Sequence, residues 1–243
     1  MLSIVSTPIG NLSDITLRAI ETLKKCDAII CEDTRVTGNL LKLLNLPKKE
    51  LISFHGYSEK GKLEYILNRL AKGEHLSLVT DSGTPGISDP GYAIVSALHA
   101  AGRGVLQYAP TRNSAPIAIE VVPGPSAFLA ALSASGLPIN QFLYLGFLPM
   151  KKGRKTLMES FKNEEHTIVF YESVHRIERT LLELADTLKN QPERLVVIAR
   201  ELTKIHEEVV TTTVRELPSV AECIMKKGEF VIMIGVKNAP STK

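Results

Sequence analysis

The sequence is poor in the residues and patterns that mark several large classes of protein. Its 243 residues include no tryptophan, 5% aromatic residues and three cysteines that form no Cys-x-x-Cys pair. An odd number of cysteines without that spacing excludes a disulfide framework and a cysteine zinc site. No apolar run approaches the ~18 residues of a membrane-spanning helix, and Met1–Leu12 lacks the basic segment of a signal peptide. We therefore expect a cytoplasmic protein with reduced cysteines and no metal site.

An excess of one charge is also lacking. Lys and Arg total 29 against 26 Asp and Glu, a net charge of +3, so any nucleic-acid partner must be gripped locally. The G-x-G-x-x-G pattern and the P-loop are absent, which disfavours classical dinucleotide or nucleoside triphosphate binding. The chain does have 44% hydrophobic residues over a length that suits two modest domains.

Short apolar strand patterns alternate with helical patterns in the first half of the chain. Strands are predicted at residues 2–6, 28–31, 51–54, 76–80, 105–108 and 117–122, and helices at 13–25, 36–44, 61–70 and 92–101. This βαβ alternation is typical of a parallel sheet covered by helices on both faces. Residues 103–116 are expected to form a peripheral or dimerising insertion, because helix-to-strand connections lie opposite the ligand side of such a sheet.

In the second half of the chain, the strand and helix patterns do not alternate regularly. Strands are predicted at residues 142–145, 167–171, 195–200, 209–214 and 230–236, and helices at 126–135, 153–161, 173–189 and 218–227, with Ser173 as an N-cap. Two successive strands joined by a short turn must pair antiparallel, so this sheet should be mixed. The prediction is a two-domain α/β protein, with an N-terminal parallel-sheet domain at residues 1–121 and a C-terminal mixed-sheet domain at residues 122–243.

The loop after the fourth predicted strand is the most informative. Thr80–Gly91 (TDSGTPGISDPG) contains three glycines and two prolines, which fix a contorted backbone without bulky Cβ atoms. Strand-to-helix loops usually need only about two to six residues, and ligands of open α/β sheets bind at the carboxyl ends of strands. This loop therefore favours a ligand cradle over a simple chain reversal.

Charged residues follow several other predicted strands. Glu32 and Asp33 could orient or activate a ribose hydroxyl, but the spacing favours the alternative that they cap the next helix and pair with Arg35. The basic segment Lys151–Lys155 (KKGRK) can grip phosphates, although such segments are commonly solvated loops. Ser126 could be a helix cap or, with its small neighbours, allow a cofactor to approach closely.

Six segments, in this order, resemble the tetrapyrrole methylase superfamily. They are STPIGNLSDIT (6–16), CEDTR (31–35), DSGTPGISDPG (81–91), VPGPSA (122–127), FYESVHR (170–176) and RELTK (200–204). Within the superfamily they resemble the branch that 2′-O-methylates a cytidine of 16S ribosomal RNA in the small ribosomal subunit. The resemblance implies two α/β domains with the active cleft between them, S-adenosylmethionine as cofactor, and a homodimer.

The resemblance also implies a set of site residues. Those that would surround the cofactor are Pro8, Asp81, Ser82, Gly83, Thr84, Ile87, Ser88, Asp89, Ser126, Ala127, Tyr171 and Leu202. Because a ribose hydroxyl is a poor nucleophile, a base or a cation should assist it. The catalytic candidates are Asp33, Arg35, His55, Glu172 and Lys204, and the substrate-binding candidates are Arg154, Lys155, His175 and Arg176. Two alternatives stay open: a porphyrinoid C-methyltransferase of the same superfamily, and a noncatalytic RNA- or ribosome-binding module.

Overall fold

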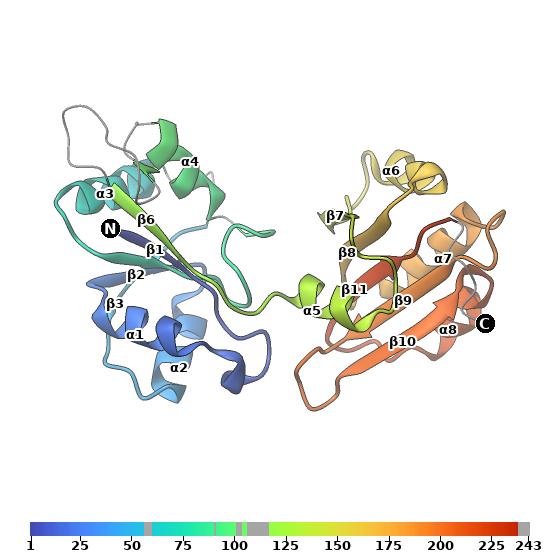
Figure 1. The fold of residues 1–243 in the computed structure, drawn as a ribbon, viewed down its shortest axis with the longest axis horizontal. Helices are drawn as coiled ribbons and strands as arrows, with labels where there is room; N and C mark the ends of the chain where they lie inside the picture. The colour runs from blue at the N-terminus through green and yellow to red at the C-terminus, as the bar shows by residue number, and fades with distance from the viewer. Residues whose placement is uncertain (56–59, 90, 101–103, 106–116, 238–243) are drawn as a thin grey trace. The chain divides into compact units, whose positions relative to one another are not determined.

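A computed structural model describes residues 1–55, 60–89, 91–100, 104–105 and 117–237. The chain divides into two compact units, Met1–Ser126 and Ala127–Lys243, which are coloured from blue to green and from green to red in Figure 1. The predicted boundary after residue 121 stays a prediction. Apart from Gly104–Val105, the predicted insertion at 103–116 lies outside the described residues.

The first unit is built on a six-stranded sheet in which every neighbouring pair is parallel, in the order β3-β2-β4-β1-β6-β5. Its strands are β1 (Leu2–Val5), β2 (Ala28–Cys31), β3 (Glu50–Ser53), β4 (Leu76–Leu78), β5 (Gly104–Val105) and β6 (Ile117–Val122). The predicted parallel sheet is confirmed. Since all strands run the same way, their carboxyl ends lie along one edge.

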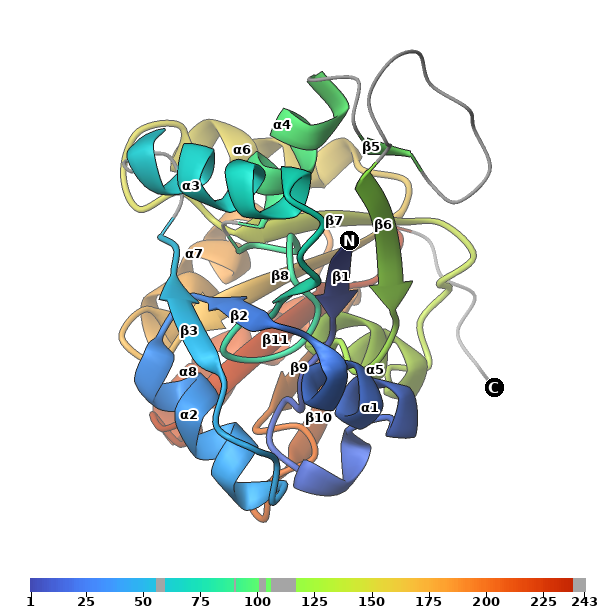
Figure 2. The same cartoon turned by 90° about the vertical axis from the view of Figure 1, so that its left-hand side faces the viewer.

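Helices cover both faces of this sheet (Figure 2). They are α1 (Leu17–Lys25), α2 (Thr34–Leu43), α3 (Lys60–Ala71) and α4 (Tyr92–Ala100). Successive strand residues point to opposite faces, so Ile29 packs with Leu23 of α1 while Ile30 packs with Ile66 of α3 and Leu98 of α4. The nearly continuous apolar strands of the sequence follow from this double coverage.

The first helix begins later than the sequence indicated. Ser13 and Asp14 lie in a short 3-10 helix, η1 (Leu12–Asp14), and Ile15 after it is extended. The extended backbone stops the helix there, and α1 starts afresh at Leu17. Its cap is Thr16, whose hydroxyl accepts the backbone N–H of Ala19 at 3.1 Å. The predicted cap at Ser13 or Asp14 is therefore wrong.

The second unit holds a five-stranded sheet in the order β10-β9-β11-β8-β7. Its strands are β7 (Phe142–Phe147), β8 (Thr167–Ser173), β9 (Leu195–Arg200), β10 (Glu208–Thr213) and β11 (Glu229–Ile234). The β7–β8 pair is parallel and the others are antiparallel, which confirms the mixed sheet. The pairings give β7, β8 and β9 one direction, so the loops that follow them lie at the same edge.

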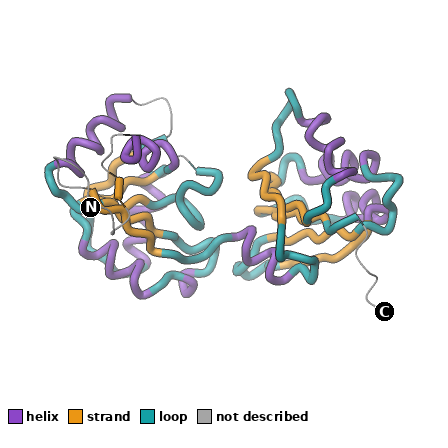
Figure 3. Tube along the Cα trace, turned by 45° about the horizontal axis from the view of Figure 1, so that its top comes forward, coloured by secondary structure: helices purple, strands orange, loops and turns teal. Residues whose placement is uncertain are grey.

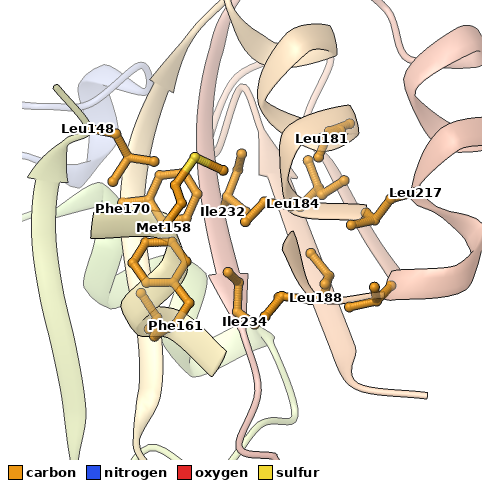
Figure 4. Packing of buried hydrophobic residues seen from close by; sticks show 14 of the residues in the cluster. Leu148, Met158, Phe161, Phe170, Leu181, Leu184, Leu188, Leu217, Ile232 and Ile234 are labelled. Atoms are coloured by element: carbon orange, nitrogen blue, oxygen red, sulfur yellow. The ribbon is translucent and has the colours of Figure 1, made fainter. Parts of the chain in front are cut away.

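Three helices and two 3-10 turns cover one face of this sheet, and one helix packs on the other (Figure 3). The first set is α6 (Arg154–Ser160), η2 (Phe161–Asn163), α7 (Ile177–Thr187), η3 (Val214–Glu216) and α8 (Leu217–Cys223); α5 (Ala127–Ala134) contacts β8 and β11. Figure 4 shows Phe161 below Phe170 on one side of the resulting core, and Ile232 beside Leu184 at its centre. Ser173 ends β8 rather than capping α7, because a turn intervenes before Ile177; that predicted cap is wrong.

Within the described residues, no helix is long and apolar enough to cross a membrane. The same residues contain no cluster of three or more His, Cys, Asp or Glu able to hold a metal ion. The cysteines are free thiols, and burial raises the pKa of both Cys26 and Cys31.

Candidate active site

The loops at the carboxyl edge of the first sheet are bonded to one another. Thr7, after β1, and Gly83, after β4, exchange two backbone hydrogen bonds of 2.9 and 3.1 Å. The Thr84 hydroxyl donates to the Pro125 carbonyl, after β6, at 3.1 Å and lies 3.0 Å from the Ser6 hydroxyl. The loops after β1, β4 and β6 therefore form one cradle whose walls are largely backbone and small hydroxyls.

Backbone conformation explains why small residues occupy this cradle. Gly83 has φ +87°, a region that L-residues with a Cβ rarely adopt. At Gly124 an added Cβ would lie 2.9 Å from the Cβ of Ser6, so any larger residue would force the loops apart. Ser88 is a non-glycine residue at φ +66°. Strain of this kind is often concentrated at functional sites.

The other predicted cofactor residues of the first unit lie on the same loops. Pro8 follows β1, Ser82 and Ile87 follow β4, and Ser126 follows β6. Ser126 is buried, Pro8 and Ile87 are half-buried, and Ser82 is exposed. The topology thus brings together residues that lie up to 118 positions apart in the sequence (8 to 126).

Three carboxylates gather where β2 and β4 end. Asp81 accepts the backbone N–H of Asp33 at 3.1 Å, which ties the two loops together. Burial raises the pKa of Asp89 to about 6, and the charges of Glu32 and Asp81 add to that shift against a hydrogen bond from Thr80. Burial and the charges of Asp81 and Asp33 also raise the pKa of Glu32. The group therefore favours a bound positive charge. From the sequence, Glu32 was considered only for a ribose hydroxyl or as a helix cap; the structure places it in this carboxylate group.

The catalytic candidates after β2 and β3 have different surroundings. Asp33 caps α2 by accepting the backbone N–H of Arg35 at 2.8 Å, and the Arg35 guanidinium lies 2.6 Å from its other oxygen. These hydrogen bonds lower the pKa of Asp33 to about 2. For Asp33, the alternative that it caps the next helix and pairs with Arg35 is therefore confirmed. His55 is exposed after β3, with Nε2 2.8 Å from the Ser53 hydroxyl.

The predicted residues of the second unit follow β8 and β9. Tyr171 is half-buried near the end of β8, with its ring centre 5.8 Å from that of Tyr144 in an edge-to-face arrangement. Leu202 is buried between two strained neighbours, Glu201 at φ +51° and Thr203 at φ +65°. Non-glycine residues in this conformation support a functional role for the loop. Ala127, at the start of α5, also belongs to this unit.

Lys204 and His175 lie at the same edge of the second sheet. The Lys204 ammonium pairs with Glu201 at 2.8 Å and with Glu229 at 3.0 Å. Although burial opposes it, this pairing raises the pKa of Lys204. His175 is exposed in the turn after β8. Lys204 is thus held in place by two carboxylates that favour its charged form.

Arg154 and Glu172 form a buried ionic network, contrary to the exposed placement expected for Arg154. Their residues are 5% and 1% exposed. Arg154 Nε lies 2.7 Å from a Glu183 oxygen, and its Nη2 donates to the Thr180 hydroxyl at 2.7 Å. Thr180 in turn donates to Glu172 at 2.7 Å, and Arg176 Nε lies 2.8 Å from the other Glu172 oxygen.

This network changes how the predicted roles are interpreted. Arg154 is the buried member of the basic segment, while Lys151, Lys152 and Lys155 are exposed. The guanidinium of Arg154 faces protein carboxylates, so in this structure it is not available to a phosphate. The partners Thr180 and Glu183 were missed; one turn apart on α7, they could have been found only by knowing which face of that helix meets α6.

The chain belongs to the tetrapyrrole (corrin/porphyrin) methylases, whose family model matches residues 1–218. It is a methyltransferase, and S-adenosylmethionine is its methyl donor. Among curated relatives, the chain is 41% identical over 236 residues to the ribosomal RNA small subunit methyltransferase I of Thermotoga maritima, covering 97% of this chain and 98% of that protein. It is 42% identical over 236 residues to the protein of that name from Xylella fastidiosa, covering 96% and 80%.

Solved structures show the same fold at lower sequence identity. A cobalt precorrin-4 methyltransferase of cobalamin biosynthesis superposes with a TM-score of 0.66 at 19% identity, covering 96% of this chain and 94% of that one. A uroporphyrin-III C-methyltransferase from Thermus thermophilus, solved with S-adenosyl homocysteine, gives 0.62 at 18% identity, covering 96% of each chain. These confirm the predicted tetrapyrrole-methylase fold.

Proposed function

We propose that this protein transfers a methyl group from S-adenosylmethionine to the ribose 2′-hydroxyl of a cytidine in the 16S RNA of the small ribosomal subunit. The observation that carries the proposal is the 41–42% identity, over nearly the whole chain, to small-subunit ribosomal RNA methyltransferases. The porphyrinoid enzymes of known structure are 18–21% identical to this chain, a likeness that concerns the fold alone. The same substrate supports a cytoplasmic location, and the family resemblance supports a homodimer.

The first unit fits the cofactor chemically. S-adenosylmethionine carries a sulfonium and an ammonium group, and both are complementary to the carboxylates of Glu32, Asp81 and Asp89. The backbone cradle around Gly83 and Thr84 brings peptide groups and small hydroxyls close together at this edge of the sheet. When bound, the cofactor supplies a methyl carbon activated by the adjacent sulfonium. Together with Tyr171, Leu202 and Ala127, these are the residues we propose to hold it.

A residue of the protein must also remove the proton of the attacking hydroxyl. Glu172 is buried and engaged by two arginines, and the low pKa of Asp33 makes it a weak base near neutral pH. His55 is exposed at the carboxyl end of β3, and histidine is the side chain that most often acts as a general base in enzymes. Among the three predicted bases, the geometry therefore favours His55, with Arg35 and Lys204 as charged partners of the substrate.

A methyl-transfer assay tests the proposed function. Small ribosomal subunits and free 16S RNA are each incubated with the protein and a cofactor carrying a labelled methyl group, and the RNA is digested to nucleosides. We expect the label in 2′-O-methylcytidine. Label in a porphyrinogen offered instead would favour the C-methyltransferase alternative. Failure to bind S-adenosylmethionine at all would favour a noncatalytic binding module.

A further inference from the structure

The loop that joins β7 to α6, residues 148–153, combines exposed cations with an exposed aromatic ring at its base. Lys151 and Lys152 are exposed in the loop, and Lys155 is exposed one residue into α6. Phe147, the last residue of β7, is 54% exposed, and Met150 in the loop is 74% exposed. Large apolar side chains this open to solvent, beside exposed positive charge, are typical of surfaces that bind a flexible polyanion with bases.

The backbone conformation of β7 sets the direction of the Phe147 side chain. The register between β7 and β8 shifts between Tyr144 and Phe147, so a bulge interrupts the ladder there, and Gly146 within it has φ +60°. Bulges re-aim side chains and are frequent beside functional sites. The re-aimed ring of Phe147 lies 5.4 Å, centre to centre, from Tyr171, a residue proposed to hold the cofactor.

The loop is also held from beneath by the buried network. Arg154 Nη1 donates to the carbonyl of Pro149 at 3.3 Å, and Arg176 Nη1 donates to the carbonyl of Leu148 at 3.0 Å. Glu172 lies between the two guanidinium groups, 3.7 Å from Arg154 and 2.8 Å from Arg176. One buried carboxylate thus orients two arginines that clamp the first two carbonyls of the loop.

We propose that the loop between β7 and α6 is a preorganised binding element for single-stranded RNA, in which Phe147 stacks on an unpaired base and Lys151 and Lys152 contact phosphates. Glu172 is a positioning residue that holds the element in its binding conformation. The inference rests on the proposed function and names the surface that takes its substrate. RNA suits this surface because its phosphates match the lysines, and its bases can stack on an aromatic ring whatever their identity.

Binding of small ribosomal subunits, measured at several salt concentrations, tests the two contact types separately. Phe147→Ala is expected to weaken binding by about 5- to 150-fold, which corresponds to about 1–3 kcal/mol at 1.4 kcal/mol per tenfold. Lys151→Ala with Lys152→Ala is expected to reduce the slope of log affinity against log salt by about 1.4 to 1.8. The matched controls are Phe142→Ala, at the other end of β7, and Lys226→Ala with Lys227→Ala, which remove the same groups from the same unit.

The positioning role needs a readout that general destabilisation would not produce. Glu172→Gln keeps the shape of the side chain but removes its charge. We expect a raised KM for the ribosomal substrate, with kcat and cofactor affinity nearly unchanged. In the background of the double lysine variant the same change should add little, because both act through one loop. If Glu172→Gln does not fold, the Phe147 and lysine variants still decide the proposal.

The outcomes separate this inference from the proposed function. If the wild-type protein does not methylate ribosomal RNA, the proposed function fails. If it does, but the Phe147 and lysine variants bind subunits as their controls do, the RNA-binding loop is refuted. A change in oligomeric state with unaltered RNA binding would likewise refute it, and would assign the surface to a second copy of this chain. The positioning role of Glu172 would be refuted if Glu172→Gln lowered kcat as much as it raised KM. It would also be refuted if the effects of Glu172→Gln and of the double lysine variant on KM were additive.

Discussion

The two sheets present loops of opposite electrostatic character at the edges where the predicted site residues lie. In the first unit, burial and the charge of Asp81 raise the pKa of both Glu32 and Asp89. In the second, Glu172 is paired with Arg154 and Arg176, and the exposed Lys151 and Lys152 lie on the loop between β7 and α6. The first edge is thus suited to a cation and the second to an anion, which are the charges of the sulfonium cofactor and of RNA.

The means of fixing the loops differ as well. Backbone hydrogen bonds and small residues hold the first edge, as between Thr7 and Gly83. Charged side chains hold the second, as between Glu172 and Arg176. A small ligand in contact with peptide groups requires the backbone to approach it closely. An exposed loop that binds a polyanion needs only to be held firmly where it joins the sheet. The comparison predicts that a given kind of substitution will have different consequences at the two edges.

The largest effect is expected from breaking the buried network. Glu172→Ala leaves Arg154 and Arg176 without their shared carboxylate, and removal of one partner from a buried ion pair costs about 3–5 kcal/mol. Chemical denaturation measures this loss. The control is Asp186→Ala, whose ion pair with Lys189 is largely exposed and worth about 0–1 kcal/mol. Equal losses in the two variants would contradict the structural importance of the network.

The next effect concerns the cradle of the first edge. Gly83→Val is expected to abolish S-adenosylmethionine binding in calorimetry while the chain stays folded. At φ +87° a branched residue must shift the loop, and the hydrogen bonds to Thr7 shift with it. Gly73→Val is the matched control, because Gly73 has φ +92° but lies outside the cradle with no atom within 4 Å of an added Cβ. Unchanged affinity in Gly83→Val would show that the cradle is wrongly assigned.

A smaller, pH-dependent effect is expected at Asp89. The folded state raises the pKa of this carboxyl from 3.8 to about 6, so the folded protein binds the proton more tightly than the unfolded chain does. The protonated carboxyl therefore favours folding below about pH 4, and this advantage is lost as the pH rises to 6 and above. Asp89→Asn should match the wild type in melting temperature near pH 4 and exceed it at pH 7.

Cofactor binding should show the opposite preference. A cationic ligand favours the ionised carboxylate, so wild-type affinity for S-adenosylmethionine should fall between pH 7 and pH 5, whereas Asp89→Asn should bind more weakly with a flatter pH profile. Calorimetry at the two pH values distinguishes these results. If the two profiles run parallel, Asp89 does not face the bound cation.

The smallest effect is expected at Asp33, a half-buried carboxylate that pairs with Arg35. Asn retains the ability to cap a helix, so Asp33→Asn should leave the melting temperature nearly unchanged and lower turnover by less than about tenfold. His55→Gln serves as the reference, with an expected loss of about 10²–10⁴-fold for removal of a general base. A loss of that size in Asp33→Asn with intact stability would instead assign the base to Asp33.

Elements with strong local signals could be predicted, and those that depend on neighbouring elements could not. The apolar strand at residues 28–31 and the glycine-rich loop at residues 80–91 were both predictable, since composition alone restricts them. The start of α1 and the cap at Ser173 were wrong, because an extended Ile15 and the extra length of β8 depend on what packs around them. The roles of individual site residues stay predictions until the variants are measured.

The sequence by itself determined the α/β order, the parallel first sheet, the mixed second sheet and the methyltransferase family, since each rests on periodicity, turn residues or ordered motifs. Only the tertiary structure decided which charges are free to act. Arg154 and Lys155 are adjacent in one basic segment, yet the first is buried against Glu183 and the second is exposed. The reason is that burial and ion pairing arise when α6 packs against α7, and residues 26 to 29 positions apart in the chain meet there.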